Sequence, residues 1–343
     1  MKEFRVSVLV TFYNQEKYVD RTLQSIINQK TDFGVKIIVG DDGSTDGTCL
    51  KVREWIDKFP DQIELYVMDR NPGKQISGFR ASRNRLKLLD YVETEYFIFL
   101  DGDDYYCYNY KLQKQVEILD DVANKDCIAC CHNTDMLYED GRRVTVTNAK
   151  IKERKYGPKE YWQKLYFHTD TLLTRRCVIE KIDKRLLENN FNDNLITFCF
   201  LQQGNLYYIP ESWTIYFQTG DGIWTSGKEV VNHIRNMFLY DLCNKINPKM
   251  KKETDFRFAS TWMELLRIRR TINPEDLGLF NVEAIDKKMD NSLKWINYRD
   301  IKFSSKLALC LKAVWKSKRK ILLHIISDIY GVTLKRFLYE RQK

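Results

Sequence analysis

Three absences narrow the classes to which this sequence of 343 residues can belong. Glycine and proline are scarce, with 15 and 6 residues, which excludes collagen-like and low-complexity chains. No run approaches the roughly 18 apolar residues of a membrane-spanning helix. The first residues, MKEFRVSVLVTFYN, reach polar Thr11 and Asn14 too early for a signal-peptide core. We therefore expect a globular, cytoplasmic protein.

Cysteine and histidine form no recognisable disulfide or metal pattern. The nine cysteines have no regular spacing, which favours a reducing compartment in which most of them are buried as small hydrophobic side chains. The segment CIACCH at 127–132 superficially resembles a zinc site, but no second cysteine pair lies at a usable spacing. Its apolar neighbours predict a buried strand instead.

Three common catalytic motifs are also missing. No G-x-G-x-x-G follows the first expected strand and no Walker A loop is present, which excludes dinucleotide-binding and P-loop proteins. A Ser-His-Asp hydrolase of the α/β type would need a G-x-S-x-G elbow, and the sequence has none.

The positive charge is concentrated near the end of the chain. The net charge is +9, and residues 306–343 contain ten Lys or Arg against only Asp328 and Glu340. Apolar residues alternate with these cations, which favours a helix that lies on an anionic membrane surface. A solvated helix face is the alternative. A nucleic-acid arm is disfavoured because no aromatic-basic surface accompanies the charge.

Apolar runs alternate with amphipathic stretches in the first hundred residues. Fully apolar strands joined by helices predict an α/β fold, with a mostly parallel sheet flanked by helices. The expected strands are Arg5–Val10, Val35–Val39, Ile63–Met68 and Tyr96–Leu100, and the expected helices are Glu16–Gln29, Thr48–Phe59 and Phe79–Tyr91.

The later pattern predicts a mixed edge of the sheet and then a helical extension. Short apolar runs surround a predicted helix from Asn194 to Gln203, and beyond Gly227 long amphipathic segments replace the strands. We expect a first domain over residues 1–225 and a helical C-terminal region over 226–343. The short runs are Cys127–Cys131, Thr171–Leu173, Leu206–Ile209 and Trp213–Phe217.

Two acidic turns follow predicted buried strands, GDDGSTDGT at 40–48 and DGDD at 101–104. Helix capping explains the later polar residues of the first turn, but it leaves the adjacent Asp41 and Asp42 unexplained. The second turn lacks the further ligands of a calcium-binding EF-hand. Its three carboxylates repel one another unless a cation or donor groups neutralise them. Both turns lie where strands end, at the edge where open α/β sheets bind ligands.

Four motifs in this order resemble those of family 2 glycosyltransferases of the GT-A fold. The resemblance covers roughly residues 4–220 and leaves the C-terminal third outside. It implies an inverting transferase of the type common in bacterial surface-polysaccharide pathways. The motifs are the first strand with Thr11-Phe12-Tyr13-Asn14, the DDGSTDGT stretch, Arg83-Asn84 after Asn71-Pro72-Gly73, and Asp101-Gly102-Asp103-Asp104.

This resemblance implies a nucleotide-sugar donor whose diphosphate leaves with extra negative charge. A divalent ion, Mn²⁺ or Mg²⁺, stabilises such charge and prefers carboxylate oxygens. Asp103 and Asp104 match the metal-binding positions, and Asp101 matches a position near the ribose or beside the metal ligands. Asp42 matches the residue that reads the nucleobase, where a carboxylate accepts a hydrogen bond from uracil N–H.

The resemblance implies three more donor contacts. Thr11 and Tyr13 match donor-binding positions at the end of the first strand, and Tyr13 is either a stacking platform or an ordinary buried tyrosine. Arg83 is the candidate for binding the diphosphate, with Lys74 and Arg80 as alternatives.

The reaction also needs a base that removes the proton of the acceptor hydroxyl. In the family this base belongs to a Glu-Asp pair at the start of a helix, and Asp193 matches it here. Asn192 replaces the first acidic residue of the pair. Asp193 could instead be only a helix N-cap, and Asp170, beside His168, is the rival base.

Another departure from the family follows the last expected strand. The basic residue and the histidine that often follow the tyrosine are missing after Tyr216. The loop at 219–226 contains Trp224, which could stack on a sugar ring, and a plain domain linker is the alternative.

We therefore expect a metal-dependent, inverting glycosyltransferase that uses a UDP-sugar. The expected acceptor is a glycan or a lipid-linked glycan. The basic tail favours the lipid-linked acceptor, because it would hold the enzyme at the inner face of the membrane. The rival from another class is a catalytically silent module that binds a sugar or nucleotide on the same fold.

Overall fold

The computed structural model divides the chain into two compact units, residues 1–226 and 227–343. In the second unit it describes helix α8 (Glu229–Ile246) and a 3₁₀ turn, Pro248–Met250. The basic tail lies outside the described residues. Among the helices of the described part, none has the length and apolar character needed to cross a membrane. The structure describes residues 2–69, 79–146, 151–164, 167–187, 193–219, 229–251, 253–254, 257 and 261.

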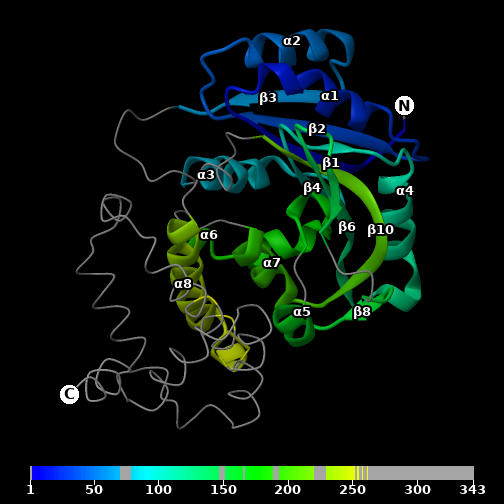
Figure 1. The fold of residues 1–343 in the computed structure, drawn as a ribbon. Helices are drawn as coiled ribbons and strands as arrows, with labels where there is room; N and C mark the ends of the chain where they lie inside the picture. The colour runs from blue at the N-terminus through cyan, green and yellow to red at the C-terminus, as the bar shows by residue number, and fades with distance from the viewer. Residues whose placement is uncertain are drawn as a thin grey trace, which may run out of the picture. The chain divides into compact units, whose positions relative to one another are not determined.

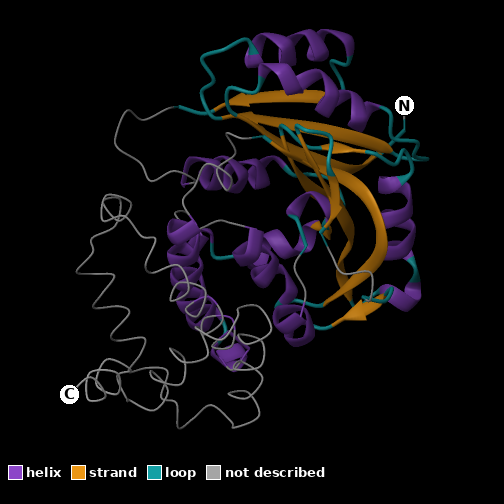
Figure 2. Ribbon diagram, in the orientation of Figure 1, coloured by secondary structure: helices purple, strands orange, loops and turns teal. Residues whose placement is uncertain are grey.

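The first unit is built on one mixed sheet (Figures 1 and 2). Neighbouring strands follow the order β3-β2-β1-β4-β9-β6-β10-β5, with β7 on β6 and β8 on β10. The first four strands in this order are mutually parallel, which confirms the predicted α/β core. The strands are β1 (Phe4–Phe12), β2 (Gly34–Asp41), β3 (Ile63–Val67), β4 (Tyr96–Asp101), β5 (Tyr105–Tyr106), β6 (Cys127–Tyr138), β7 (Arg143–Thr145), β8 (Arg154–Tyr156), β9 (Leu173–Arg175) and β10 (Asn205–Gln218).

Helices cover both faces of this sheet, as its fully apolar strands require. The helices are α1 (Glu16–Ile27), α2 (Thr48–Lys58), α3 (Phe79–Leu88), α4 (Lys111–Asp120), α5 (Pro158–Lys164), α6 (Lys184–Leu187) and α7 (Asp193–Leu201). Short 3₁₀ segments connect them at η1 (Leu89–Tyr91), η2 (Val122–Asn124), η3 (Thr169–Thr171) and η4 (Arg176–Lys181).

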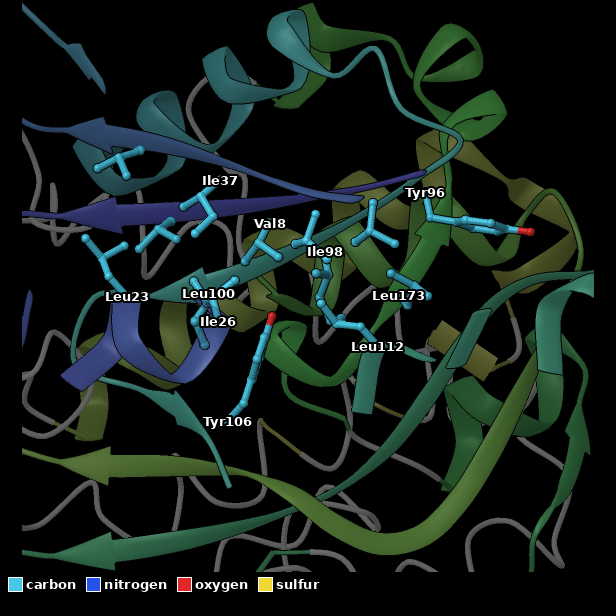
Figure 3. Close-up of a cluster of buried hydrophobic side chains, with 14 of the residues drawn as sticks. Val8, Leu23, Ile26, Ile37, Tyr96, Ile98, Leu100, Tyr106, Leu112 and Leu173 are labelled. Atoms are coloured by element: carbon cyan, nitrogen blue, oxygen red, sulfur yellow. The ribbon is translucent and has the colours of Figure 1, made fainter. Parts of the chain in front are cut away.

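Alternate residues of β1 pack into two different layers. Val8 belongs to the cluster in which side chains of α1, α2 and α4 meet the sheet (Figure 3). Leu9 points to the opposite face, where α3 contacts β1 and β2. On that second face, Phe97 of β4 meets Phe200 of α7 edge-on, with ring centroids 5.6 Å apart. Burial of each such side chain contributes about 1.5–3 kcal/mol, so both layers stabilise the edge on which the polar turns are built.

The predicted mixed edge is confirmed, but two of its strands differ from the prediction. The runs 206–209 and 213–217 belong to one strand, β10, whose register against β6 shifts between Ile209 and Thr214. Pro210 lies within this irregular stretch, where a residue without an N–H is tolerated. The predicted strand at 171–173 begins instead as the 3₁₀ turn η3, because the Thr171 N–H and hydroxyl both bond the carbonyl of residue 168.

The structure confirms the strand predicted for the CIACCH segment. Residues 127–132 form the first half of β6 and are all buried. Burial holds the pKa of His132 well below its usual value, with the neighbouring Lys111 acting in the same direction. This histidine is therefore a neutral core residue.

Candidate active site

The two acidic turns meet at one edge of the sheet, because their strands end side by side. Thr11 of β1 pairs in register with Asp101 of β4, and the next residue, Phe12, pairs with Asp41 of β2. The N–H of Gly102 donates to the Thr11 carbonyl at 2.9 Å. The side chains that follow β1, β2 and β4 therefore face a common space.

Within the first turn, Asp41 and Asp42 have different environments. Asp41 is fully buried and accepts hydrogen bonds from the N–H and the hydroxyl of Ser44, at 2.7 and 2.5 Å. Asp46 accepts from the N–H of Thr48 at 3.0 Å and so supports the start of α2. Asp41 and Asp46 therefore shape the turn. Asp42 is half-buried and stays the candidate for a nucleobase contact.

The second turn brings three carboxylates, Asp101, Asp103 and Asp104, close together. Asp104 is fully buried, and its Oδ1 accepts a hydrogen bond from the Phe217 N–H at 2.8 Å. Its Oδ2 has no hydrogen-bond partner among the described residues. Burial, together with Asp103 and other nearby acids, raises the pKa of Asp104 well above its usual value. Burial and the charge of Asp101 raise the pKa of Asp103 to about 6.

One group of described residues has the geometry of a cation site. Oxygen atoms of Asp101 and Asp104 and a ring nitrogen of His168 all lie within 4.8 Å of one another. The unpartnered buried Oδ2 of Asp104 fits a cation, because carboxylate oxygens are ligands of divalent ions. Asp103 is adjacent in the chain but is not a member of this group. Of the two predicted metal ligands, Asp104 therefore belongs to this group and Asp103 does not.

Arg85 of α3 connects the second acidic turn to the predicted base. Its Nη1 donates to Asp193 Oδ1 at 2.8 Å, and its Nη2 donates to Asp101 Oδ1. Only 12% of the Arg85 side chain is exposed. Although burial opposes the charged form, Arg85 holds the pKa of Asp101 below its usual value, with help from His168. Thr11 Oγ1 donates to the same Asp101 oxygen at 3.2 Å.

Asp193 is the first residue of α7, and 9% of it is exposed. Besides Arg85, the hydroxyl of Thr169 donates to its Oδ1 at 3.3 Å. Its Oδ2 lies 3.8 Å from His168 Nε2, which is beyond hydrogen-bond distance. The hydrogen bonds described for this carboxylate therefore connect it to α3 and η3. A residue that only caps its own helix needs no such contacts with other elements.

The rival base, Asp170, lies deeper in the protein. It is 1% exposed, and its Oδ1 is 2.9 Å from Nδ1 of His168. Burial lowers the pKa of His168, but Asp170, Asp193 and Asp104 outweigh it and raise that pKa well above its usual value. The ring of Tyr216 lies against the imidazole, with centroids 4.3 Å apart. Asp170 is therefore placed to act on the histidine rather than on an acceptor.

The remaining predicted donor contacts lie on the same edge or on α3. Tyr13 is 39% exposed and is therefore not an ordinary buried tyrosine. Arg83 has an exposed side chain, whereas the neighbouring Asn84 is buried and donates to the Gly40 carbonyl at 2.9 Å. Lys74, the Arg80 side chain, Asn192 and Trp224 lie outside the residues that the structure describes.

Sequence reasoning missed Arg85 and assigned no role to His168. A signal for Arg85 existed, because it lies among buried positions of α3 that include Asn84, Leu86 and Leu88. A cation on the buried side of a helix requires an anionic partner. His168 gave no comparable signal, because apart from Asp170 its contacts are with residues distant in the sequence, Asp104, Asp193 and Tyr216.

Comparison with solved structures identifies the fold. The chain superimposes on Staphylococcus aureus TarS 1–349 in complex with UDP-GlcNAc with a TM-score of 0.60, at 18% identity and over 99% of this chain and 92% of that one. The mannosyltransferase PcManGT from Pyrobaculum calidifontis, in complex with GDP-Man and Mn²⁺, gives 0.52 at 15% identity, over 92% and 88% of the two chains. These likenesses establish the GT-A fold.

The family follows from the sequence. The family described as glycosyl transferase family 2 matches residues 7–183, and the chain belongs to it. An uncharacterized protein of Mycobacterium tuberculosis is 26% identical over 230 residues, which are 64% of this chain and 61% of that protein. The putative teichuronic acid biosynthesis glycosyltransferase TuaG of Bacillus subtilis is 31% identical over 136 residues, or 40% and 49% of the two chains. The match thus spans about three-fifths of the mycobacterial relative.

Proposed function

We propose that this protein is an inverting glycosyltransferase that moves a sugar from a UDP-sugar to an acceptor hydroxyl. The observation that carries the proposal is the chain of contacts Asp101–Arg85–Asp193, which joins the acidic turn to the carboxylate that we propose as the base. Membership of family 2 supports the reaction class. The UDP-GlcNAc bound to TarS, a protein of the same fold, supports a UDP-sugar as the donor.

The donor would occupy the edge formed by β1, β2 and β4. Asp42 would accept a hydrogen bond from the uracil N–H, the exposed ring of Tyr13 would stack against the base, and Thr11 and Asp101 would face the ribose. Arg83 is the proposed contact to the diphosphate. Its exposed side chain would have to turn toward the edge, and the buried Asn84 beside it would anchor this part of α3.

A divalent metal is part of the proposal because the residues fit one. Asp104 and His168 would hold it, together with Asp101 or Asp103, and when bound it would neutralise charge on the leaving diphosphate. Asp103, whose pKa is about 6, would be ionised at neutral pH and ready to bind a cation.

The chain's own contribution to the chemical step is proton removal by Asp193. As the acceptor oxygen forms a bond to the anomeric carbon, its proton passes to Asp193 Oδ2, the oxygen without a described hydrogen bond. The bond between the anomeric carbon and the phosphate oxygen breaks, and the electron pair leaves with UDP. This single displacement on the face opposite the leaving group inverts the configuration of the sugar.

The test is a calorimetric titration of UDP into the protein with Mn²⁺ and then with EDTA. We expect a dissociation constant on the order of micromolar with Mn²⁺ and at least roughly tenfold weaker binding with EDTA. GDP and CMP serve as controls for the nucleobase. A panel of UDP-glucose, UDP-galactose, UDP-GlcNAc and UDP-GalNAc then measures the release of UDP. Binding without turnover of any donor would favour the silent module, and preferred binding of GDP would contradict the role of Asp42.

The proposed acceptor is a glycan or a lipid-linked glycan at the inner face of the membrane. The relative TuaG is a putative teichuronic acid biosynthesis glycosyltransferase, which supports a surface-glycan acceptor. The basic tail at 306–343, with ten Lys or Arg, supports contact with anionic lipid.

We expect vesicles that contain phosphatidylglycerol to retain the full chain in a sedimentation assay. Each basic residue near the surface contributes about 1 kcal/mol, so retention should fall as salt is raised. Vesicles of pure phosphatidylcholine are the control. Equal sedimentation of a variant in which Lys316, Lys318, Arg319 and Lys320 are changed to Gln would show that the tail does not bind the lipid.

A further inference from the structure

Arg85 of α3 donates hydrogen bonds both to the acidic turn and to the predicted base. Its two Nη atoms donate to different carboxylates, Asp193 and Asp101, in a fork that only a guanidinium offers. These carboxylates lie at the end of β4 and at the start of α7, two elements far apart in the sequence. The guanidinium therefore fixes their separation.

The two carboxylate oxygens of Asp193 have different hydrogen-bond partners. Oδ1 accepts hydrogen bonds from Arg85 and from the Thr169 hydroxyl, at 2.8 and 3.3 Å. Oδ2 lies 3.8 Å from His168 Nε2, which is beyond hydrogen-bond distance. Two donors on Oδ1 restrict the rotation of the carboxylate and leave Oδ2 as the oxygen that can take up a proton.

Each partner of Arg85 has a second anchor, which makes the arrangement specific. Thr11 of β1 holds Asp101 at 3.2 Å, and the N–H of Gly102 bonds the Thr11 carbonyl. The donor edge, the Arg85 fork and Asp193 therefore form one connected set of contacts.

We propose that Arg85 is a positioning residue that orients Asp193 as the base and ties its placement to the donor-binding edge through Asp101. The inference rests on the proposed function and assigns Arg85 no contact with the donor. Asp193 then aims its Oδ2 at the acceptor hydroxyl, and Arg85 balances the charge of both carboxylates while the proton is transferred.

The experiment compares Arg85→Gln and Arg85→Lys in the full chain, with Lys87→Gln as a matched control. Lys87 lies on the same helix with an exposed side chain and pairs with Asp90 on the surface. For each variant we would measure UDP affinity with Mn²⁺ by calorimetry. The release of UDP from the fastest donor of the panel gives kcat and KM, and the melting temperature reports folding.

We expect Arg85→Gln to lower kcat about 100-fold while the KM for the donor and the UDP affinity stay within about threefold. Arg85→Lys should recover part of the loss, because it keeps the charge but not the fork. Since Arg85 acts through Asp193, the double variant Arg85→Gln/Asp193→Asn should be no slower than Asp193→Asn alone. Lys87→Gln should match the wild type.

Loss of UDP affinity in parallel with kcat would overturn the proposal and make Arg85 a donor-binding residue. Losses of kcat that add in the double variant Arg85→Gln/Asp193→Asn would also overturn it. So would an Arg85→Lys variant that melts like the wild type and keeps full kcat. A wild-type protein that binds no UDP would instead refute the proposed function, which is a different outcome. If Arg85→Gln does not fold, the split between kcat and KM in Arg85→Lys decides.

Discussion

Asp193→Asn is expected to lower turnover about 1,000-fold and to leave UDP affinity unchanged. The amide keeps the shape of the carboxylate, and its oxygen can still accept from Arg85 and Thr169, so the local structure should persist. It cannot take a proton from the acceptor, and general-base catalysis typically contributes about 10²–10⁴-fold. The release of UDP from the fastest donor measures kcat, and calorimetry with Mn²⁺ measures binding.

Two further variants make this result specific. Asp140→Asn alters an exposed surface carboxylate and should leave kcat unchanged. Asp170→Asn should have a smaller effect than Asp193→Asn, because Asp170 is buried and lies 2.9 Å from His168 Nδ1. A variant Asp193→Asn with more than about a tenth of wild-type turnover would exclude it as the base, since proton removal contributes at least about 10²-fold. A larger loss in Asp170→Asn would transfer the role to that residue.

The core of the fold was predictable because its strands are buried on both faces. Val8 and Leu9 point to opposite layers and both are fully buried, so β1 appears in the sequence as an apolar run, Val6–Val10, in which the only polar residue is the buried Ser7. Such a run, repeated between amphipathic helices, is typical of a parallel sheet that is covered on both sides. β10 was harder to predict because Pro210 and Glu211 interrupt its apolar pattern, while pairing with β6 continues across the irregular stretch.

The acidic edge was predictable for a related reason. Parallel strands end at the same edge, so turns that follow β2 and β4 must approach each other, and the register pair Thr11–Asp101 shows how closely they do so. The sequence pattern could not separate Asp41 from its neighbour Asp42. Only the contacts with Ser44 identify Asp41 as part of the turn's own framework.

The connections between the acidic edge and the base were not predictable from the sequence. Arg85, His168 and Asp193 meet because η3 packs against β4 and α7 begins beside Arg85 of α3, and no local pattern encodes that packing. The family resemblance supplied Asp193 as a position in a motif. The structure adds that its carboxylate is held by side chains from two other elements, Arg85 of α3 and Thr169 of η3.

Asp104→Asn is expected to weaken Mn²⁺-dependent UDP binding at least roughly 30-fold without destabilising the protein. Burial and the neighbouring acids raise the pKa of Asp104, so the metal-free fold favours its neutral form. A carboxyl whose pKa is higher in the folded than in the unfolded protein lowers the free energy of unfolding at any pH above its usual pKa, and neutral pH lies in that range. A neutral amide at this position avoids the cost. In EDTA, Asp104→Asn should therefore melt at or above the wild-type temperature. With Mn²⁺, the variant should bind UDP more weakly, because the substitution removes a charged metal ligand.

Asp104→Ala separates the structural role of this side chain from its role in binding. The Asn oxygen can still accept from the Phe217 N–H, whereas Ala leaves that buried donor unpaired, which costs about 1–3 kcal/mol. Ala should therefore lower both the melting temperature in EDTA and Mn²⁺-dependent binding, while Asn lowers binding alone. Unchanged Mn²⁺ dependence in Asp104→Asn would place the cation on Asp101 and Asp103 and leave Asp104 as a support for β10. The same outcome would make His168, which lies 4.0 Å from Asp104 through its Nδ1, a partner of the acidic residues rather than of a metal.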